Sequence, residues 1–165
     1  MGDSSRTTFS IPSHHLRPQQ LRVLNSLVSQ MAGPIDVVLK QPPAPDSEAG
    51  GDHVSMRLVH GTSCLVLERD EWPDGGIATE EQLTAAGIPF IRTNNVTRDY
   101  MASRTVSDGT TTIEIRLDHG GCPIVGVSIR DSLVLIDTEE LTDIQRSVVL
   151  TSSILTLPTP EAVSR

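Results

Sequence analysis

Aromatic side chains are scarce in this sequence, because two phenylalanines, one tryptophan and one tyrosine make up only 2% of its 165 residues. The chain therefore lacks the aromatic platforms that stack on single-stranded nucleic acid and the aromatic cages that bind quaternary ammonium groups. Cationic residues are also in the minority, with 13 Lys and Arg against 21 Asp and Glu and a net charge of −8. Because phosphate binding depends on a dense field of cations, this balance argues against nucleic acid as a partner.

Other absences narrow the class of protein further. Two cysteines are too few for a disulfide-rich scaffold. No apolar run is long enough to cross a bilayer, and residues 1–6 contain no apolar leader, so we expect no membrane association and a cytoplasmic protein. The length predicts a single domain with an aliphatic core. We place that domain at 17–157, with flexible tails at 1–16 and 158–165 and a disordered proline-rich loop at 41–53.

The stretch from residue 109 to residue 155 has the clearest pattern. Ile113, Ile115 and Leu117 alternate with charged residues, which predicts a strand with one buried face. Residues 123–129 and 133–136 are apolar at almost every position, which is typical of strands covered on both faces. A helix with an Asp137–Glu140 capping pair follows. The second cover is either another helix layer or a second copy of the chain, and this favours a homodimer.

The remaining elements complete the predicted fold. Apolar spacing predicts a helix from Pro18 to Gly33, and residues 54–67 predict a hairpin. A capping box at Thr79 predicts a short helix that ends at Gly87, and a strand follows. Residues 94–108 show no period and are either an ordered functional loop or a mobile one. We expect an α+β or α/β fold with a mixed central sheet of about six to seven strands, an antiparallel C-terminal meander and flanking N- and C-terminal helices.

Residues 85–92 (AAGIPFIR) and 123–136 (PIVGVSIRDSLVLI) resemble the degenerate phospholipase-D-like sensor domains of some bacterial transcriptional regulators. In that family, a glycine-containing strand that ends in arginine precedes a hairpin that begins at proline and has a central aspartate. The resemblance implies a catalytically inactive sensing or dimerising module. The His-x-Lys pattern of active phospholipases is absent, because His119 is followed by two glycines, and no helix-turn-helix segment is evident.

Both cysteines closely follow a histidine in a glycine-containing turn. The two sets are His60 with Cys64, and His119 with Cys122. Two imidazoles and two thiolates can form a tetrahedral zinc set, so zinc is a candidate cofactor at these residues, although they do not specify one. The alternatives are a Cys–His nucleophile pair, a disulfide between the two cysteines, or two turn histidines that each lie near a small buried thiol.

An acidic run near the middle of the chain is a second candidate site. Asp70 and Glu71 precede Trp72, the only tryptophan, and this group is a candidate partner-binding site. The alternatives are a solvated turn beside a core tryptophan, or carboxylates that hold a hard cation.

The sequence favours a non-enzymatic regulatory or protein-interaction module that forms a homodimer or binds a protein partner. This hypothesis depends on the apolar strands and on the lack of a coherent catalytic set. The first alternative is a small metal-dependent or Cys/His enzyme that uses the two His-Gly turns. The second alternative is a structural component of a larger assembly, such as a phage particle.

Overall fold

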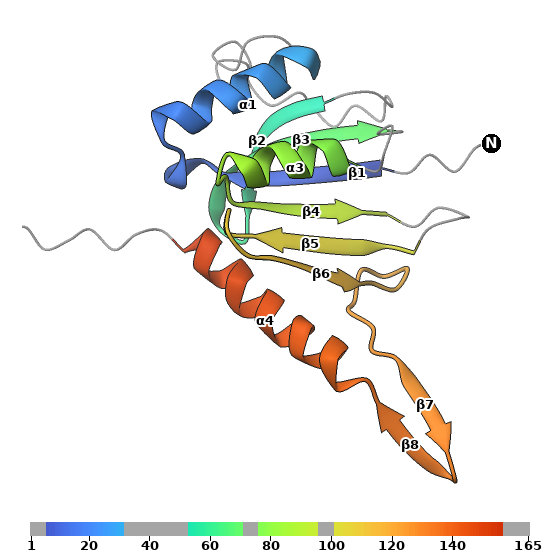
Figure 1. The fold of residues 1–165 in the computed structure, drawn as a ribbon. Coiled ribbons are helices and arrows are strands. Elements are labelled where there is room, and N and C mark those ends of the chain that lie inside the picture. Colours follow the sequence, from blue (N-terminus) through green and yellow to red (C-terminus); the bar gives the residue numbers. More distant parts are fainter. Residues whose placement is uncertain (1–5, 32–52, 71–75, 96–100, 157–165) are drawn as a thin grey trace, which may run out of the picture.

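The chain folds as an α+β protein, as the sequence predicts. The computed structural model describes residues 6–31, 53–70, 76–95 and 101–156 (Figure 1). The helices in this part of the chain are α1 (Pro18–Met31), α3 (Ile77–Ala85), α4 (Thr138–Leu155) and a short 3-10 turn at Ser13–His15. The strands are β1 (Arg6–Pro12), β2 (His53–Val59), β3 (Thr62–Asp70), β4 (Phe90–Asn94), β5 (Ser103–Ser107), β6 (Thr112–Arg116), β7 (Val127–Arg130) and β8 (Leu133–Ile136).

Six strands form the central sheet in the order β2-β3-β1-β4-β5-β6. Every pair of neighbouring strands is antiparallel. The expectation of a mixed sheet is therefore wrong. The expected flexible tail at 1–16 is wrong from Arg6 onward, because β1 lies between β3 and β4. Phe9 and Ile11 on β1 are fully buried, whereas Ser10 on the other face is half-buried. The Ser- and Thr-rich composition concealed this alternation, which is the pattern of a strand with two unlike faces.

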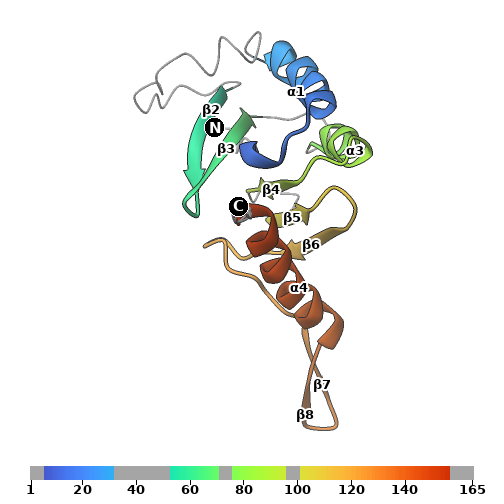
Figure 2. The same cartoon turned by 90° about the vertical axis from the view of Figure 1, so that its left-hand side faces the viewer.

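Two apolar layers cover opposite faces of the sheet (Figures 1 and 2). On one face, the buried side of α1 packs with Phe9 and Phe90, and α3 contributes Leu83. On the other face, Ile154 and Leu155 of α4 pack against Ile91 and its neighbours. Phe90 and Ile91 are consecutive on β4 and therefore point to opposite faces. The aliphatic core that the composition predicts is thus divided between two layers.

The last two strands leave the sheet. β7 and β8 form a separate two-stranded hairpin that extends past β6 together with the first turns of α4 (Figure 1). The expected three-stranded meander breaks between Leu117 and Val127, where a single bridge from Leu117 to Pro123 replaces a ladder. Pro123 has no N–H to donate, and Asp118 draws the amides of Gly120 and Cys122 into a tight turn at 2.8 Å each.

The expected enclosure of these apolar strands is also wrong for the single chain. All eight residues of β7 and β8 are exposed. Six of them are aliphatic, with between 44% and 75% of their surface exposed. Their composition resembles that of a buried strand, but no other layer of the described chain covers them. A homodimer would therefore have to cover strands that the single chain leaves exposed.

Helix ends show which local signals are reliable. Asp137 caps α4, because its carboxylate accepts hydrogen bonds from the amides of Glu139 and Glu140 at 3.0 Å. The Glu140 half of the predicted capping pair is wrong, because its carboxylate contacts Gly126 and Arg116 while the amide of Asp137 donates to the carbonyl of Gly126. Thr79 does not cap α3, which begins after Gly76; Thr79 is instead buried within the helix. Gly87 adopts the predicted left-handed conformation with φ of +63°.

Several expectations on connecting segments have different outcomes. The hairpin predicted from residues 54–67 is confirmed as β2 and β3. The aperiodic stretch 94–108 contains β5, which the sequence analysis missed. The predicted loop at 41–53 lies outside the described residues except for His53, which begins β2, and the tail at 158–165 lies outside them entirely. Among the described helices, none is both long and apolar enough to cross a membrane.

Candidate functional site

The two His-Gly turns lie at opposite corners of the sheet. His60 and Cys64 lie at the start of β3, near one edge, whereas His119 and Cys122 follow the end of β6, at the other edge. β3 and β6 are four strand spacings apart, a separation of about 19 Å. The antiparallel order makes these two strands point the same way, so the start of one and the end of the other also lie at opposite ends of the sheet.

The predicted four-residue zinc set is therefore not assembled. Within the described ranges, no group of three or more His, Cys, Asp or Glu side chains is placed to hold a metal ion. Both thiols are free, so the alternative Cys64–Cys122 disulfide is not present. Cys64 is fully buried, and burial raises the pKa of its thiol, which disfavours the thiolate that a Cys–His nucleophile or a zinc ligand requires.

The acidic run is partly involved in ion pairs within the sheet. Glu68 is buried, and its carboxylate accepts two hydrogen bonds from the Arg57 guanidinium at 2.7 and 3.2 Å. Asp70, a predicted partner-binding residue, is half-buried at the end of β3, with its Oδ1 3.8 Å from Nε of Arg6. The other two predicted partner-binding residues, Glu71 and Trp72, lie outside the described residues. That prediction therefore remains untested.

A buried arginine forms an ionic cluster with two carboxylates. Arg92 is 5% exposed, and its guanidinium lies 2.9 Å from Glu80 on α3 and 3.3 Å from Glu114 on β6. It also donates a hydrogen bond to the hydroxyl of buried Thr105 at 3.0 Å. Burial raises the pKa of Glu80, and the positive charge of Arg92 offsets part of that shift. The cluster joins α3 to three neighbouring strands, which is a structural role.

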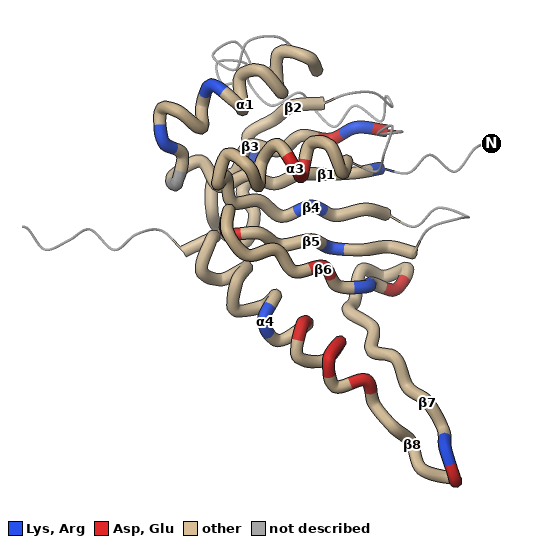
Figure 3. The backbone as a smooth tube through the Cα atoms, in the orientation of Figure 1, with Lys and Arg blue, Asp and Glu red and all other residues tan. Residues whose placement is uncertain are grey.

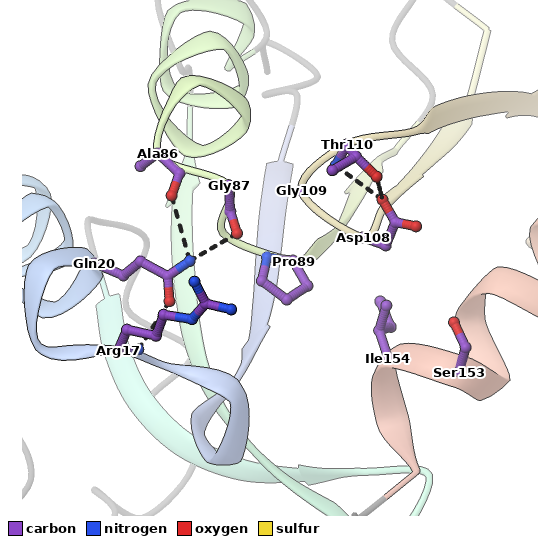
Figure 4. Close-up of a pocket in the computed structure, with 10 residues that line it drawn as sticks. All are labelled: Arg17, Gln20, Ala86, Gly87, Pro89, Asp108, Gly109, Thr110, Ser153 and Ile154. Atoms are coloured by element: carbon purple, nitrogen blue, oxygen red, sulfur yellow. Dashed lines mark hydrogen bonds between the residues drawn. The ribbon is translucent and has the colours of Figure 1, made fainter.

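A cavity of about 470 Å3 lies where α1, the β5–β6 turn and α4 converge (Figure 4). The Gln20 side-chain amide donates to the carbonyls of Ala86 and Gly87 and so joins α1 to the end of α3. Asp108 accepts hydrogen bonds from the amides of Thr111 and Thr110, which lower the pKa of its carboxyl. The lining residues are Arg17, Gln20, Ala86, Gly87, Pro89, Asp108, Gly109, Thr110, Ser153 and Ile154. This set contains no histidine or cysteine, and the Ser153 hydroxyl donates to the carbonyl of Leu150. The Thr110 hydroxyl donates to Asp108 at 2.7 Å, within the turn that the Asp108 carboxylate holds together.

The exposed hairpin is the feature that the enclosed-strand expectation missed. Its register pairs Val127 with Ile136 and Ile129 with Val134. Residues that pair across an antiparallel ladder point to the same side, so these four β-branched side chains form one face. We call this the aliphatic face. The opposite side consists of the two pairs Ser128–Leu135 and Arg130–Leu133, and we call it the mixed face.

The tip and the base of the hairpin are both well defined. At the tip, Asp131 and Ser132 have φ of +49° and +65°, a two-residue turn that fixes the register. Charged residues occur on the hairpin only at this tip (Figure 3). At the base, one Glu140 carboxylate oxygen accepts from the amide of Gly126 at 2.5 Å, and the other pairs with Arg116 on β6. These contacts hold the hairpin to the sheet and to α4.

Short strand length is the sequence signal that bears on this exposure. Only ten residues separate Gly126 from Asp137. In the structure, pairing with the preceding strand is reduced to the single bridge between Leu117 and Pro123. Together, the fold and this surface define an α+β protein with a projecting apolar hairpin. Comparison with family models, with curated proteins and with solved structures gave no match for this chain.

Proposed function

We propose that this chain is a non-enzymatic protein-interaction module that forms a homodimer through the β7–β8 hairpin. The observation that carries the proposal is the exposure of six aliphatic side chains among the eight strand residues of the hairpin. An isolated two-stranded hairpin is at best marginally stable in water, so such a hairpin needs a cover. Scattered exposed aliphatic residues need no explanation, but a contiguous apolar patch marks an interaction surface.

The energy available from this surface favours a partner that is itself apolar. Full burial of one aliphatic side chain stabilises by about 1.5–3 kcal/mol, and roughly half or more of that gain is still unrealised for each of the six. One hairpin therefore offers on the order of 6–12 kcal/mol when both of its faces are covered, and roughly two thirds of that when one face with four of the six side chains is covered. Association costs about 4–15 kcal/mol, so a single hairpin against a polar surface yields little. Two hairpins that cover each other supply twice the gain for one association cost.

The apolar area of the hairpin also favours a second copy of the chain as the partner. The energy above corresponds to roughly 240–480 Å2 of apolar surface, against about 800 Å2 per partner in a standard interface. A second copy is the partner that brings an equal apolar surface with certainty. Leu141 and Val148 lie seven residues apart on one stripe of α4 and are 39% and 61% exposed, so the helix that follows the hairpin also carries exposed aliphatic surface.

The chemistry of the tip argues against a lipid surface as the cover. A hairpin that enters a bilayer tip first has to bury its turn before its strands. Here the turn carries Arg130, Asp131 and Ser132, all exposed, and burial of such charges in hydrocarbon is costly. A dimer leaves this turn in water.

The resemblance to phospholipase-D-like sensor domains implies a related role, a catalytically inactive dimerising module in a bacterial regulator. That likeness stays a prediction. The regulatory role and the cytoplasmic location that the sequence analysis expects belong to the same proposal.

Light scattering coupled to size-exclusion chromatography tests the dimer. We expect a mass of twice 17.8 kDa at micromolar concentration and dissociation on dilution. Ile129→Asp should give a monomer, because it places a charge on a surface that the dimer buries. The matched control is Leu58→Asp on β2, since Leu58 is 76% exposed and Ile129 is 75% exposed, and it should remain dimeric. A wild-type monomer at high concentration would overturn the proposal, as would equal effects of the two variants.

A further inference from the structure

The two faces of the hairpin differ in chemistry, and this difference specifies the dimer. We infer that two copies pack aliphatic face against aliphatic face around a two-fold axis, with the mixed faces turned outward. This inference rests on the proposed self-association and adds which side of the hairpin forms the contact. The four residues of the buried side are Val127, Ile129, Val134 and Ile136.

The composition of the aliphatic face suits a contact with itself. A two-fold interface uses the same patch on both subunits, so the patch has to complement a copy of itself. A surface of only Val and Ile meets this condition, because it contains no charge that would face a like charge across the axis. Both residue types are β-branched and hold one preferred χ1 rotamer, so little side-chain entropy is lost when they interdigitate.

The mixed face does not meet the same condition. Its Arg130 guanidinium pairs with no carboxylate within the described residues, so burial would leave an uncompensated charge. In a two-fold contact, the hydroxyl of Ser128 would also have to find a partner. The chain itself already covers part of this side, since Leu135 is the least exposed of the six hairpin aliphatics, at 44%. The members of the aliphatic face are 55–75% exposed.

Two adjacent residues on β8 provide a matched test of which face packs. Val134 belongs to the aliphatic face and is 66% exposed, whereas Leu133 belongs to the mixed face and is 65% exposed. The test compares Val134→Asp with Leu133→Asp in a dilution series followed by light scattering. Val134→Asp should raise the dimer dissociation constant by at least about 30-fold, because its charge would be buried at the centre of the contact. Leu133→Asp should change it by less than about threefold.

Crosslinking gives a second measurement, which detects the face contact directly and does not depend on weakening the dimer. Exposed Cys122 is first replaced with Ser, and fully buried Cys64 is left in place. Packed sheets lie about 10 Å apart, which a short bis-maleimide can span. Val134→Cys should then give a covalent dimer, and Leu133→Cys should not. Circular dichroism of each variant should match the wild type, since both side chains are exposed.

The outcomes separate this inference from the proposed function. A dimeric wild type with a larger effect at Leu133 than at Val134 would overturn the face assignment and leave the dimer intact. Equal effects at both positions would also overturn it, in favour of edge-to-edge pairing of the strands. A wild-type monomer would remove the proposed function itself.

Discussion

Replacement of Arg92 by methionine tests the ionic cluster that joins α3 to the sheet. Methionine keeps most of the length of the side chain and removes its charge. Glu80 then loses the guanidinium that lies 2.9 Å away. Because only 21% of the Glu80 side chain is exposed, water can replace little of that interaction. Glu114 loses a partner at 3.3 Å, but 57% of its side chain is exposed, so water replaces much of that interaction.

The expected loss of stability follows from these exposures. Removal of one partner from a buried ion pair costs about 3–5 kcal/mol, because the other charge stays buried without compensation. Glu80 is incompletely buried, so we expect the lower end, about 3 kcal/mol, from this pair. The exposed Glu114 pair adds about 0–1 kcal/mol. Since domains of this size have a free energy of unfolding of about 5–15 kcal/mol, the variant should fold but unfold at clearly lower urea concentration.

The pH dependence of that loss identifies its cause. Burial raises the pKa of Glu80, and Arg92 opposes the shift, so the pKa should rise further in Arg92→Met. A carboxyl whose pKa is higher in the folded chain than in the unfolded chain destabilises the fold as pH rises through the folded pKa, and the cost vanishes when it is protonated. The penalty should therefore be large at pH 7.5 and smaller at pH 4.5.

Urea unfolding followed by far-ultraviolet circular dichroism, at one fixed protein concentration, measures the penalty at both pH values. The control is the double variant Arg92→Met with Glu80→Gln, which has no carboxyl to titrate at this position. It should recover at least half of the lost stability at pH 7.5 and show no extra pH dependence. An equal penalty for Arg92→Met at both pH values would refute the electrostatic reasoning and point to lost packing.

Three further predictions concern local features. A maleimide reagent should label exposed Cys122 within minutes in the native protein and Cys64 only after denaturation; rapid double labelling would contradict the burial of Cys64. Gly109→Ala should lower the urea midpoint more than Gly61→Ala. Both glycines have positive φ, so both substitutions strain the backbone. A Cβ at Gly109 would also lie 2.4 Å from the carbonyl oxygen of Gly87, whereas a Cβ at Gly61 would meet nothing within 4 Å. Glu140→Ala should speed amide hydrogen exchange in residues 127–136 with about 1–2 kcal/mol or less of global destabilisation, and the neighbouring Glu139→Ala should not; equal exchange in the two variants would dismiss the role of Glu140 at the hairpin base.

The sequence patterns predicted most of the helices and strands, because these patterns depend on residues that are close together in the chain. The helical spacing in α1 and the alternation of Ile113 and Ile115 depend only on which side of an element faces the core. The Asp137 cap depends only on neighbouring amides. β1 was missed because two buried residues, Phe9 and Ile11, stand among serines and threonines, and their burial depends on strands far along the chain.

The site could not be predicted in the same way, because strand order decides which residues meet. The His60 and His119 turns look alike in sequence, yet four strand spacings separate the strands that carry them. The apolar composition of residues 127–136 indicates that burial of these strands is favourable. It does not indicate whether the same chain or a partner buries them. The hairpin is exposed because its strands leave the sheet at the break in pairing after Leu117.

The central position of β1 makes the first ordered strand the link between two otherwise separate pieces of sheet. β2 and β3 form one piece of the sheet, and β4, β5 and β6 form the other. β1 joins the two pieces, because it pairs with β3 on one side and with β4 on the other. Each piece is built from contacts close in sequence, so hairpins should form early and the docking of β1 should complete the sheet late. A chain that starts after Pro12 would then contain an open slot, and a synthetic peptide of residues 6–12 added in trans should fill that slot and restore the fold.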